Sequence, residues 1–130
     1  GIPWGIVTNK PRGLSEALLA ALNLTERCAV LVCPEDVTRT KPDPEPMYLA
    51  ARQINLPAEQ IIYVGDHPRD IEAGRNAGMY TILAAYGYLP LSHKDNLTAW
   101  QADCIVNDIS ELRQKVCQLL KLESEKPVVL

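Results

Sequence analysis

The sequence predicts an α/β fold in which a parallel sheet is covered by helices on both faces. Short apolar segments alternate along the chain with segments of helical periodicity, as in parallel sheets built from crossover units. Polar residues follow directly after the strand segments at Thr8 and Asp66. Right-handed crossovers bring the carboxyl ends of parallel strands to one edge of the sheet, so we expect these polar residues to meet there.

The expected strands are short, apolar and bounded by Gly, Pro or polar residues. They are Trp4–Val7, Ala29–Cys33, Ile61–Val64, Tyr80–Ala84 and Cys104–Val106. A longer loop is expected over residues 85–100. No internal repeat or linker interrupts the series. We therefore expect residues 1–122 to form one domain and residues 123–130 to form a C-terminal tail.

The expected helices lie between these strands and after the last of them. The first follows Pro11, with one apolar face formed by Leu14, Ala17, Leu18, Ala21 and Leu22. The second covers residues 46–55, with a buried stripe of Tyr48, Ala51 and Ile54. The third covers residues 68–77, with Gly78 as a left-handed C-cap. The fourth is capped by Asn107 or Asp108 and has its apolar face at Leu112, Val116, Leu119 and Leu120.

Composition narrows the classes of function. The chain has 130 residues, 47% of them hydrophobic, which suits one globular domain with a modest core. A net charge of -3 gives no footprint for nucleic acid or an anionic membrane, although a local basic pocket for a small anion is compatible with it. No apolar run reaches the roughly 20 residues of a membrane span.

The cysteines favour a reducing, cytoplasmic location. There are four, at Cys28, Cys33, Cys104 and Cys117, and none forms a C-x-x-C pair. Buried reduced thiols are therefore expected in preference to disulfides. A zinc site is disfavoured, because His67 and His93 show no ligand spacing to the cysteines.

The strongest local signal for chemistry is the carboxylate pair Asp66 and Asp70. The apolar strand 61–64 ends at Gly65, and the two carboxylates follow four residues apart. Ligands in open α/β sheets bind just past the carboxyl ends of strands, and oxygen donors there suit Mg²⁺. The structural alternative is that Asp66 caps the next helix and Asp70 is a favourable charge in its first turn.

Two further segments supply groups for an anion. Thr8 and Asn9 follow the first strand, where a hydroxyl, an amide and backbone N–H groups can face a phosphate, although both residue types also suit helix caps. Lys41 lies in Thr40-Lys41-Pro42-Asp43-Pro44. Prolines stiffen this loop, so it can present the ammonium as a fixed charge; the alternative is a solvated surface lysine.

These segments together resemble the haloacid dehalogenase superfamily of phosphatases. Ile6-Val7-Thr8-Asn9-Lys10 resembles its second motif, Lys41-Pro42-Asp43-Pro44 its third, and Val64-Gly65-Asp66 through Asp70 and on to Met79 its fourth. The order and spacing agree, and the resemblance covers nearly the whole chain. Residues 64–79 and 84–88 are similar both to phosphoglycolate phosphatases and to bacterial relatives acting on N-acetylmuramic acid 6-phosphate.

The resemblance implies a three-layer, Rossmann-like parallel sheet and a role for each motif residue. Thr8 would bind the transferring phosphoryl group, and Asn9 would help to position the substrate. Lys41 would neutralise charge on the phosphoryl group and on the nucleophile. Asp66 would ligate Mg²⁺, and Asp70 would complete or orient that site. The implied reaction is hydrolysis of a small phosphorylated metabolite through an aspartyl-phosphate.

The sequence departs from the family pattern at its start. The family's nucleophile and acid-base lie in an Asp-x-Asp-Gly-Thr motif on the first, central strand, but only seven residues precede Thr8 and no Asp-x-Asp occurs in the chain. The helical cap is missing as well. We therefore expect this chain to be the C-terminal part of a phosphatase, with an incomplete sheet and no activity alone. Its expected partner is the missing N-terminal half.

Two other classes of function remain open from the sequence. One is a non-catalytic module that binds phosphate or metal. The other is an interaction subunit whose open sheet edges pair with another chain. The substrate is also left open, because in this family the choice lies largely in the cap.

Overall fold

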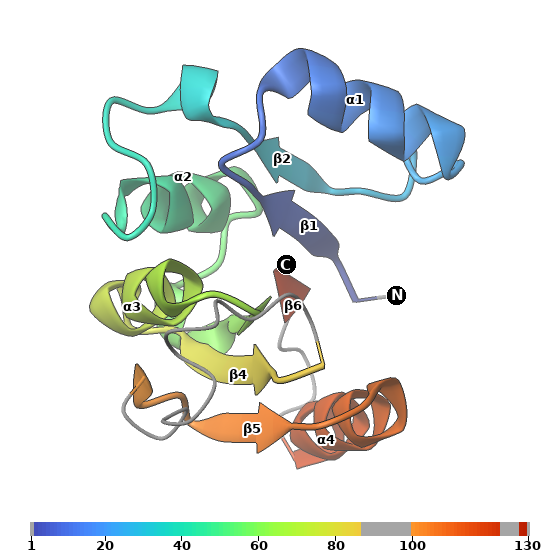
Figure 1. Cartoon of the computed structure of the whole chain (residues 1–130), viewed down its shortest axis with the longest axis vertical. Coiled ribbons are helices and arrows are strands. Elements are labelled where there is room, and N and C mark those ends of the chain that lie inside the picture. Colours follow the sequence, from blue (N-terminus) through green and yellow to red (C-terminus); the bar gives the residue numbers. More distant parts are fainter. Residues whose placement is uncertain (1, 87–99, 123–127, 130) are drawn as a thin grey trace.

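The computed structural model describes residues 2–86, 100–122 and 128–129, and they form a single parallel sheet with four helices (Figure 1). The strand order is β2-β1-β6-β3-β4-β5, and every pair of neighbours is parallel. The strands are β1 (Trp4–Val7), β2 (Val30–Val32), β3 (Ile62–Gly65), β4 (Tyr80–Ala84), β5 (Cys104–Val106) and β6 (Val128–Val129). The helices are α1 (Arg12–Ala21), α2 (Glu45–Gln53), α3 (Pro68–Ala77) and α4 (Ile109–Leu122), with short 3₁₀ turns η1 (Pro34–Asp36) and η2 (Ala58–Gln60). The predicted α/β class is confirmed.

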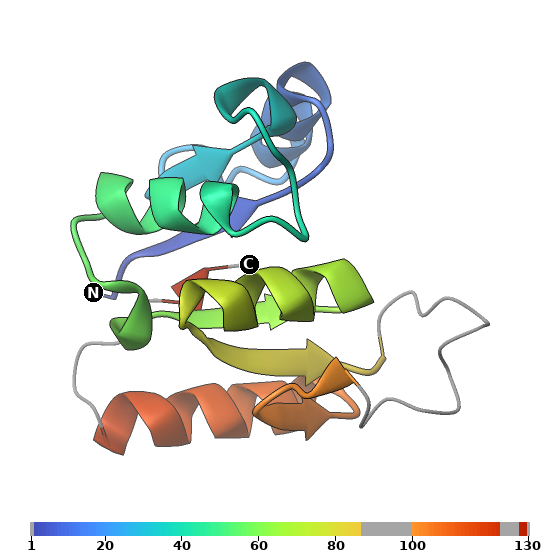
Figure 2. The same cartoon turned by 90° about the vertical axis from the view of Figure 1, so that its left-hand side faces the viewer.

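Side chains alternate along the strands between the two faces of the sheet, and Figure 2 looks onto the face that α2 and α3 cover. Val7 and Tyr63 point toward α2 and α3, where they pack with Met47 and Ala73. Residues one position along the same strands point to the opposite face. There Ile62, Val64, Ile82, Ala84 and Val106 pack against the apolar face of α4. The sheet is therefore the middle of three layers, as the alternating pattern predicted.

Several boundaries fall where the sequence placed them. β1, α3, β4 and β5 have the predicted limits, and Gly78 closes α3 in the left-handed region at φ 84°. Asp108 accepts a hydrogen bond from the Glu111 N–H at 2.8 Å, so Asp108 caps the start of α4. The predicted loop over 85–100 lies mostly outside the described residues.

The apolar face predicted for α1 differs from what the helix buries. Leu14, Leu18 and Leu22 are 63%, 47% and 57% exposed, whereas the buried residues of α1 are Ser15 and Leu19. Tyr48 of α2 is also exposed, and Met47 and Ala50 are buried in its place. Periodicity identified both helices. The predicted face of α1 is wrong by about one position, whereas in α2 Ala51 is buried and Ile54 packs against the core, as predicted.

The expected C-terminal tail requires a correction at two residues. Val128–Val129 form β6, which lies in the middle of the sheet between β1 and β3. Val128 pairs with Trp4 on one side and Ile62 on the other, and Val129 pairs with Gly5 and Tyr63. The position that we expected to be open is therefore occupied by a strand of two residues.

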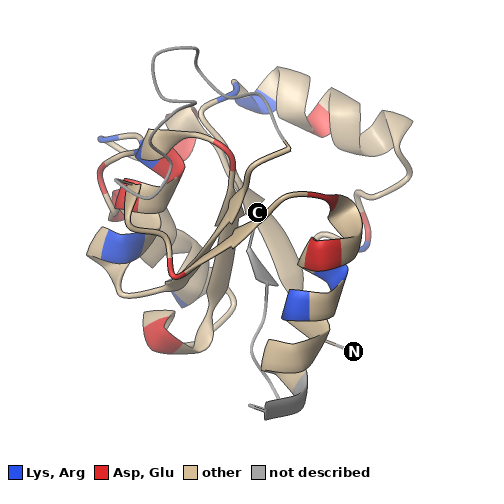
Figure 3. Ribbon diagram, turned by 60° about the horizontal axis from the view of Figure 1, so that its bottom comes forward, with Lys and Arg blue, Asp and Glu red and all other residues tan. Residues whose placement is uncertain are grey.

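Charged residues of both signs occur together, and the cysteines are free thiols. Basic and acidic residues are mixed on the same helices in the described part of the chain (Figure 3). All four cysteines are free, as predicted, but only Cys33 is buried and Cys117 is exposed. Among the described residues, no helix combines the length and the apolar character needed to cross a bilayer.

Candidate active site

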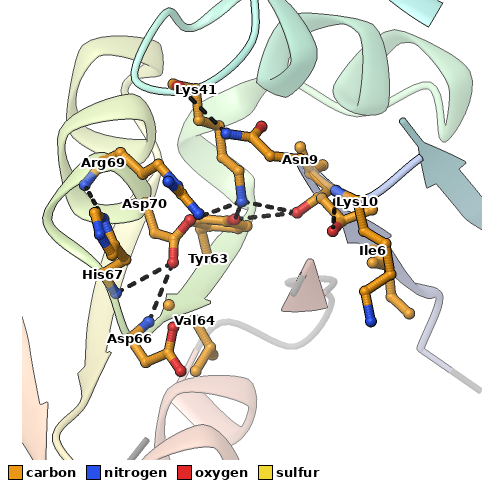
Figure 4. A pocket seen from close by; sticks show the side chains of 13 residues that line it. Ile6, Asn9, Lys10, Lys41, Tyr63, Val64, Asp66, His67, Arg69 and Asp70 are labelled. Carbon is orange, nitrogen blue, oxygen red and sulfur yellow. Dashed lines mark hydrogen bonds and ion pairs between the residues drawn. The ribbon is translucent and has the colours of Figure 1, made fainter. Parts of the chain in front are cut away.

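A cavity of about 690 Å³ opens where the carboxyl ends of β1 and β3 meet the loop that carries Lys41. The structure brings together in its lining all five residues singled out from the sequence (Figure 4). They are Thr8, Asn9, Lys41, Asp66 and Asp70. The convergence expected from parallel strand ends is therefore present in the fold, although their chemical roles stay predictions.

Thr8 and Asn9 form the turn that leaves β1. The Thr8 N–H donates to the Val32 carbonyl at 3.0 Å, which ties the turn to β2, and the Thr8 Oγ1 accepts from the Lys10 N–H at 3.0 Å. The Asn9 Nδ2 donates to the Lys41 carbonyl at 3.4 Å. Neither residue caps α1, whose N-cap position is Pro11. Their polar groups belong to the cavity wall, and the cap alternative is wrong.

Lys41 is a buried cation, 8% exposed, and not a solvated surface lysine. Its Nζ donates to the Val7 carbonyl at 3.0 Å, to the Tyr63 Oη at 2.8 Å and to the Asp70 Oδ1 at 2.7 Å. The Lys41-Pro42 peptide bond is cis. An ammonium has three hydrogens, so these three acceptors satisfy all of them.

Burial has the largest effect on the pKa values of Lys41 and Tyr63. Desolvation lowers the pKa of Lys41 from its ordinary 10.5, and the attraction of Asp70 opposes that shift without cancelling it. Burial, and then the charge of Asp70, raise the pKa of Tyr63 well above 10.0. The phenol therefore keeps its proton at neutral pH and can donate while it accepts from Lys41.

Asp70 anchors the start of α3 as well as Lys41. Its Oδ2 accepts from the N–H groups of Asp66 and His67, both at 3.2 Å. His67 is the N-cap of α3, and its Nδ1 accepts from the Arg69 N–H at 3.2 Å, so the two side chains form a capping box. The alternative in which Asp66 is the N-cap is therefore wrong. Asp70 does lie in the first turn, as that alternative proposed.

Gly65 allows Asp70 to lie this close to the end of β3. A Cβ built on Gly65 would be 2.3 Å from the Asp70 Cβ, a distance that real Cβ atoms do not show. Only glycine fits where the strand passes directly beneath the first turn of α3. The glycine in Val64-Gly65-Asp66 is thus required by close packing as well as by the turn.

Asp66 and Asp70 could serve a Mg²⁺ site in which the protein supplies only one or two of the ligands. Among the described residues, no three His, Cys, Asp or Glu side chains are grouped to hold a metal ion. Mg²⁺ commonly uses only one or two protein carboxylates and completes its shell with water and phosphate oxygens. Both oxygens of Asp70 already accept hydrogen bonds, so Asp70 is better suited to orient such a site than to ligate a cation.

Sequence reasoning missed two groups at this site, the Tyr63 hydroxyl and the Val7 carbonyl. Both bind Lys41. The periodicity of β3 marks Tyr63 only as a buried strand residue. One signal was available: a buried tyrosine usually finds a partner for its hydroxyl, and Tyr63 is two residues from the end of its strand.

The fold and the cavity together define a three-layer α/β protein whose candidate site lies at the carboxyl edge of a parallel sheet. Residues 1–84 match the family model described as haloacid dehalogenase-like hydrolase. That match covers more than half of the chain, and the chain belongs to this family.

Relatives with known names agree. Over 112 residues the chain is 46% identical to the N-acetylmuramic acid 6-phosphate phosphatase of Pseudomonas aeruginosa, covering 86% of this chain and 49% of that protein. Over 106 residues it is 46% identical to the phosphoglycolate phosphatase of Xylella fastidiosa, covering 82% and 45%. A crystal structure of a predicted phosphoglycolate phosphatase from Haemophilus somnus superposes with a TM-score of 0.76 at 26% identity, covering 88% and 49%. The chain thus spans about half the length of the curated relatives it matches.

Proposed function

We propose that the protein to which this chain contributes hydrolyses a small phosphate monoester with the help of Mg²⁺. The observation that carries the proposal is the meeting of Lys41, Thr8 and Asp66 in one cavity at the strand ends. Phosphoryl transfer depends mainly on positioning and on cations and N–H donors that stabilise the phosphoryl oxygens. Membership of the haloacid dehalogenase-like hydrolases supports the same reaction class.

Each side chain has a role that matches its position. Thr8 would donate its hydroxyl to a phosphoryl oxygen, and Asn9 would position the substrate beside it. Lys41 would offset negative charge that develops on the phosphoryl group. Asp66 would hold Mg²⁺, with Asp70 orienting the site, and the bound cation would supply further charge neutralisation.

The nucleophile is the part of the reaction that these residues do not supply. The 130 residues contain no Asp-x-Asp, the pattern that the resemblance requires for an aspartyl-phosphate. We therefore propose that this chain alone is inactive and that it provides the phosphate and cation half of the site. The nucleophile would come from a segment preceding this one in the complete protein.

The names of the relatives suggest the substrate. The two curated proteins compared above are named for phosphoglycolate and for N-acetylmuramic acid 6-phosphate. We propose a substrate of this kind, a small phosphorylated metabolite. A panel containing both esters, assayed with the complete protein, would distinguish them.

A non-catalytic module that binds phosphate or metal is the second candidate, favoured by the missing Asp-x-Asp. The reading frame upstream of Gly1 discriminates: an in-frame Asp-x-Asp-Gly-Thr supports the enzyme, and a start codon at this position supports the module. The chain itself should leave p-nitrophenyl phosphate intact in the presence of Mg²⁺. Turnover that Lys41→Ala abolishes would contradict the claim that the nucleophile lies elsewhere.

Binding to the chain tests the half-site directly. We expect inorganic phosphate, titrated with Mg²⁺ and followed by NMR, to shift the amides of residues 8–10 and 65–67. Thr8→Val should weaken phosphate and Asp66→Asn should weaken Mg²⁺. Thr25→Val and Glu72→Gln, at exposed positions, are the matched controls. Equal effects of the site and control variants would refute the assignment.

A further inference from the structure

The hydroxyl of Tyr63 is the buried polar group that links Lys41 to β1. Tyr63 lies on β3 and is 1% exposed. Its Oη accepts from the Lys41 Nζ at 2.8 Å and donates to the Val7 carbonyl at 3.3 Å. One phenol therefore bridges the last residue of β1 and the loop that carries the cation (Figure 4).

The ring of Tyr63 is held so that its hydroxyl has one position. A Cβ on Gly74 of α3 would lie 3.4 Å from the Tyr63 Cδ2 and 2.6 Å from the Thr81 Cγ2, so α3 crosses directly over the ring. The same cluster packs Met47 and Ala73 around it. Side chains in such packed interiors occupy defined rotamers. The phenol is thus a rigid acceptor, unlike a hydroxyl on a flexible side chain.

Lys41 needs rigid acceptors to be useful as a fixed charge. A lysine carries its ammonium on a flexible stem of four carbons, and nothing within the side chain fixes its direction. Of the three acceptors, only Asp70 is charged, and Asp70 is also engaged with the start of α3. The Val7 carbonyl and the Tyr63 Oη are fixed by the strand and by the packed ring.

We propose that Tyr63 is a positioning residue, whose hydroxyl, with the Val7 carbonyl, holds the charge of the Lys41 ammonium in one place beside the anion-binding cavity. The inference rests on the proposed function and adds a residue that the motifs do not contain. The competing explanation is that the hydroxyl only satisfies its own buried hydrogen-bonding needs. That explanation predicts an effect on stability and none on Lys41 or on phosphate.

The test is Tyr63→Phe in the 130-residue chain, which removes the hydroxyl and keeps the ring. Tyr48→Phe is the matched control, because the Tyr48 hydroxyl also donates to a backbone carbonyl, that of Asn76 at 3.1 Å, away from the cavity. The ammonium of Lys41 is observed by ¹⁵N NMR and assigned by its loss in Lys41→Arg. We expect its hydrogens to exchange roughly tenfold faster in Tyr63→Phe. We expect inorganic phosphate to bind roughly fivefold more weakly, about the effect of one hydrogen bond.

The outcomes separate this proposal from the proposed function. If Tyr63→Phe lowers the unfolding temperature but leaves Lys41 exchange and phosphate affinity as in Tyr48→Phe, the positioning role is overturned. If the wild-type chain binds no phosphate, the proposed function loses its support, while Lys41 exchange still decides the role of Tyr63. If Tyr63→Phe does not fold, 3-fluorotyrosine labelling replaces it. The Tyr63 fluorine resonance should then move on addition of phosphate while that of Tyr48 stays, and an unmoved Tyr63 resonance overturns the proposal.

Discussion

Lys41 and Asp70 form an ion pair 2.7 Å long between Nζ and Oδ1, with side chains only 6% and 10% exposed. The pair joins the proline-flanked loop to the first turn of α3, two segments between which α2 and β3 lie in the sequence. Stabilisation by such a buried pair is conditional, because each charge has lost its hydration and depends on its partner. The pair therefore fixes the site while making each member costly to remove alone.

Removal of one partner should therefore destabilise the fold strongly. We expect Lys41→Met or Asp70→Asn to lower the free energy of unfolding by about 3 kcal/mol each, since either leaves a buried group without its partner. The double variant should lose less than the sum of the two. Urea unfolding of the wild type, the two single variants and the double variant measures the coupling free energy between Lys41 and Asp70.

An exposed ion pair provides the matched control for this double-mutant cycle. Arg39 and Asp43 are 3.7 Å apart, and the Arg39 side chain is 76% exposed. Their removal should cost less than about 1 kcal/mol with little coupling, because water screens the pair. Equal coupling energies in the two cycles would contradict the view that burial makes the Lys41–Asp70 pair special.

Substitution of Gly65 should damage the site through packing alone. In Gly65→Ala the new methyl group would overlap the Asp70 Cβ, so either β3 or α3 must move. We expect a loss of about 2 kcal/mol or more, measured by thermal and urea unfolding. Gly13→Ala is the control: nothing lies within 4 Å of its Cβ, and alanine inside α1 should stabilise by roughly 0.5–1 kcal/mol. A Gly65→Ala variant as stable as the wild type would refute the close contact.

Stability should depend on Asp36 in the acid range. Burial raises the pKa of Asp36, but the Cys33 N–H and the Arg12 guanidinium outweigh it, so the pKa is lowered from 3.8. Between the lowered pKa and 3.8 the unfolded chain binds more protons than the folded chain. The free energy of unfolding therefore rises with pH through this window. The contribution of Asp36 to stability is lost as the pH falls through the same window. Asp36→Asn should show a flatter acid branch than the wild type and than Glu16→Gln; parallel branches would rule out this contribution.

The short strand β6 should matter through its backbone. Val129→Pro removes an N–H from the middle of the sheet, whereas Val129→Ala keeps it. We expect the proline variant to unfold at a lower temperature and to lose about 1–2 kcal/mol more than the alanine variant, the cost of an unpaired buried group. Sedimentation should also show association as the inner edges of β1 and β3 open. Identical behaviour of the two variants would mean that β6 does not pair as described.

The parts of the fold that could be predicted from the sequence are those with a local cause. α3 was placed correctly because Pro68 suits its first position and Gly78 its left-handed cap. β5 lies directly between the polar residues Asp103 and Asn107, and its limits were also correct. The convergence of the motif residues followed from the parallel strand ends alone, with no knowledge of side-chain contacts.

The parts that could not be predicted depend on tertiary contacts. The sequence around Tyr63 does not indicate that its hydroxyl contacts Lys41, which lies 22 positions away in the sequence. Burial of Lys41 is likewise a property of the strands and helix around it. β6 is only two residues long and follows a polar segment, so its pairing depends on the space left between β1 and β3.

The place of β6 has a consequence for the order in which these residues can fold. Val128–Val129 follow every other strand in the sequence, yet they lie between the unit β1–β2 and the unit β3–β5. Each unit can form from neighbouring segments, whereas the strand that connects them follows both units in the sequence. The pairing of Val128 with Trp4 joins residues from opposite ends of the chain, and contacts of such long separation form slowly. When the 130 residues refold from denaturant, two separate half-sheets should therefore form before β6 pairs with both of them.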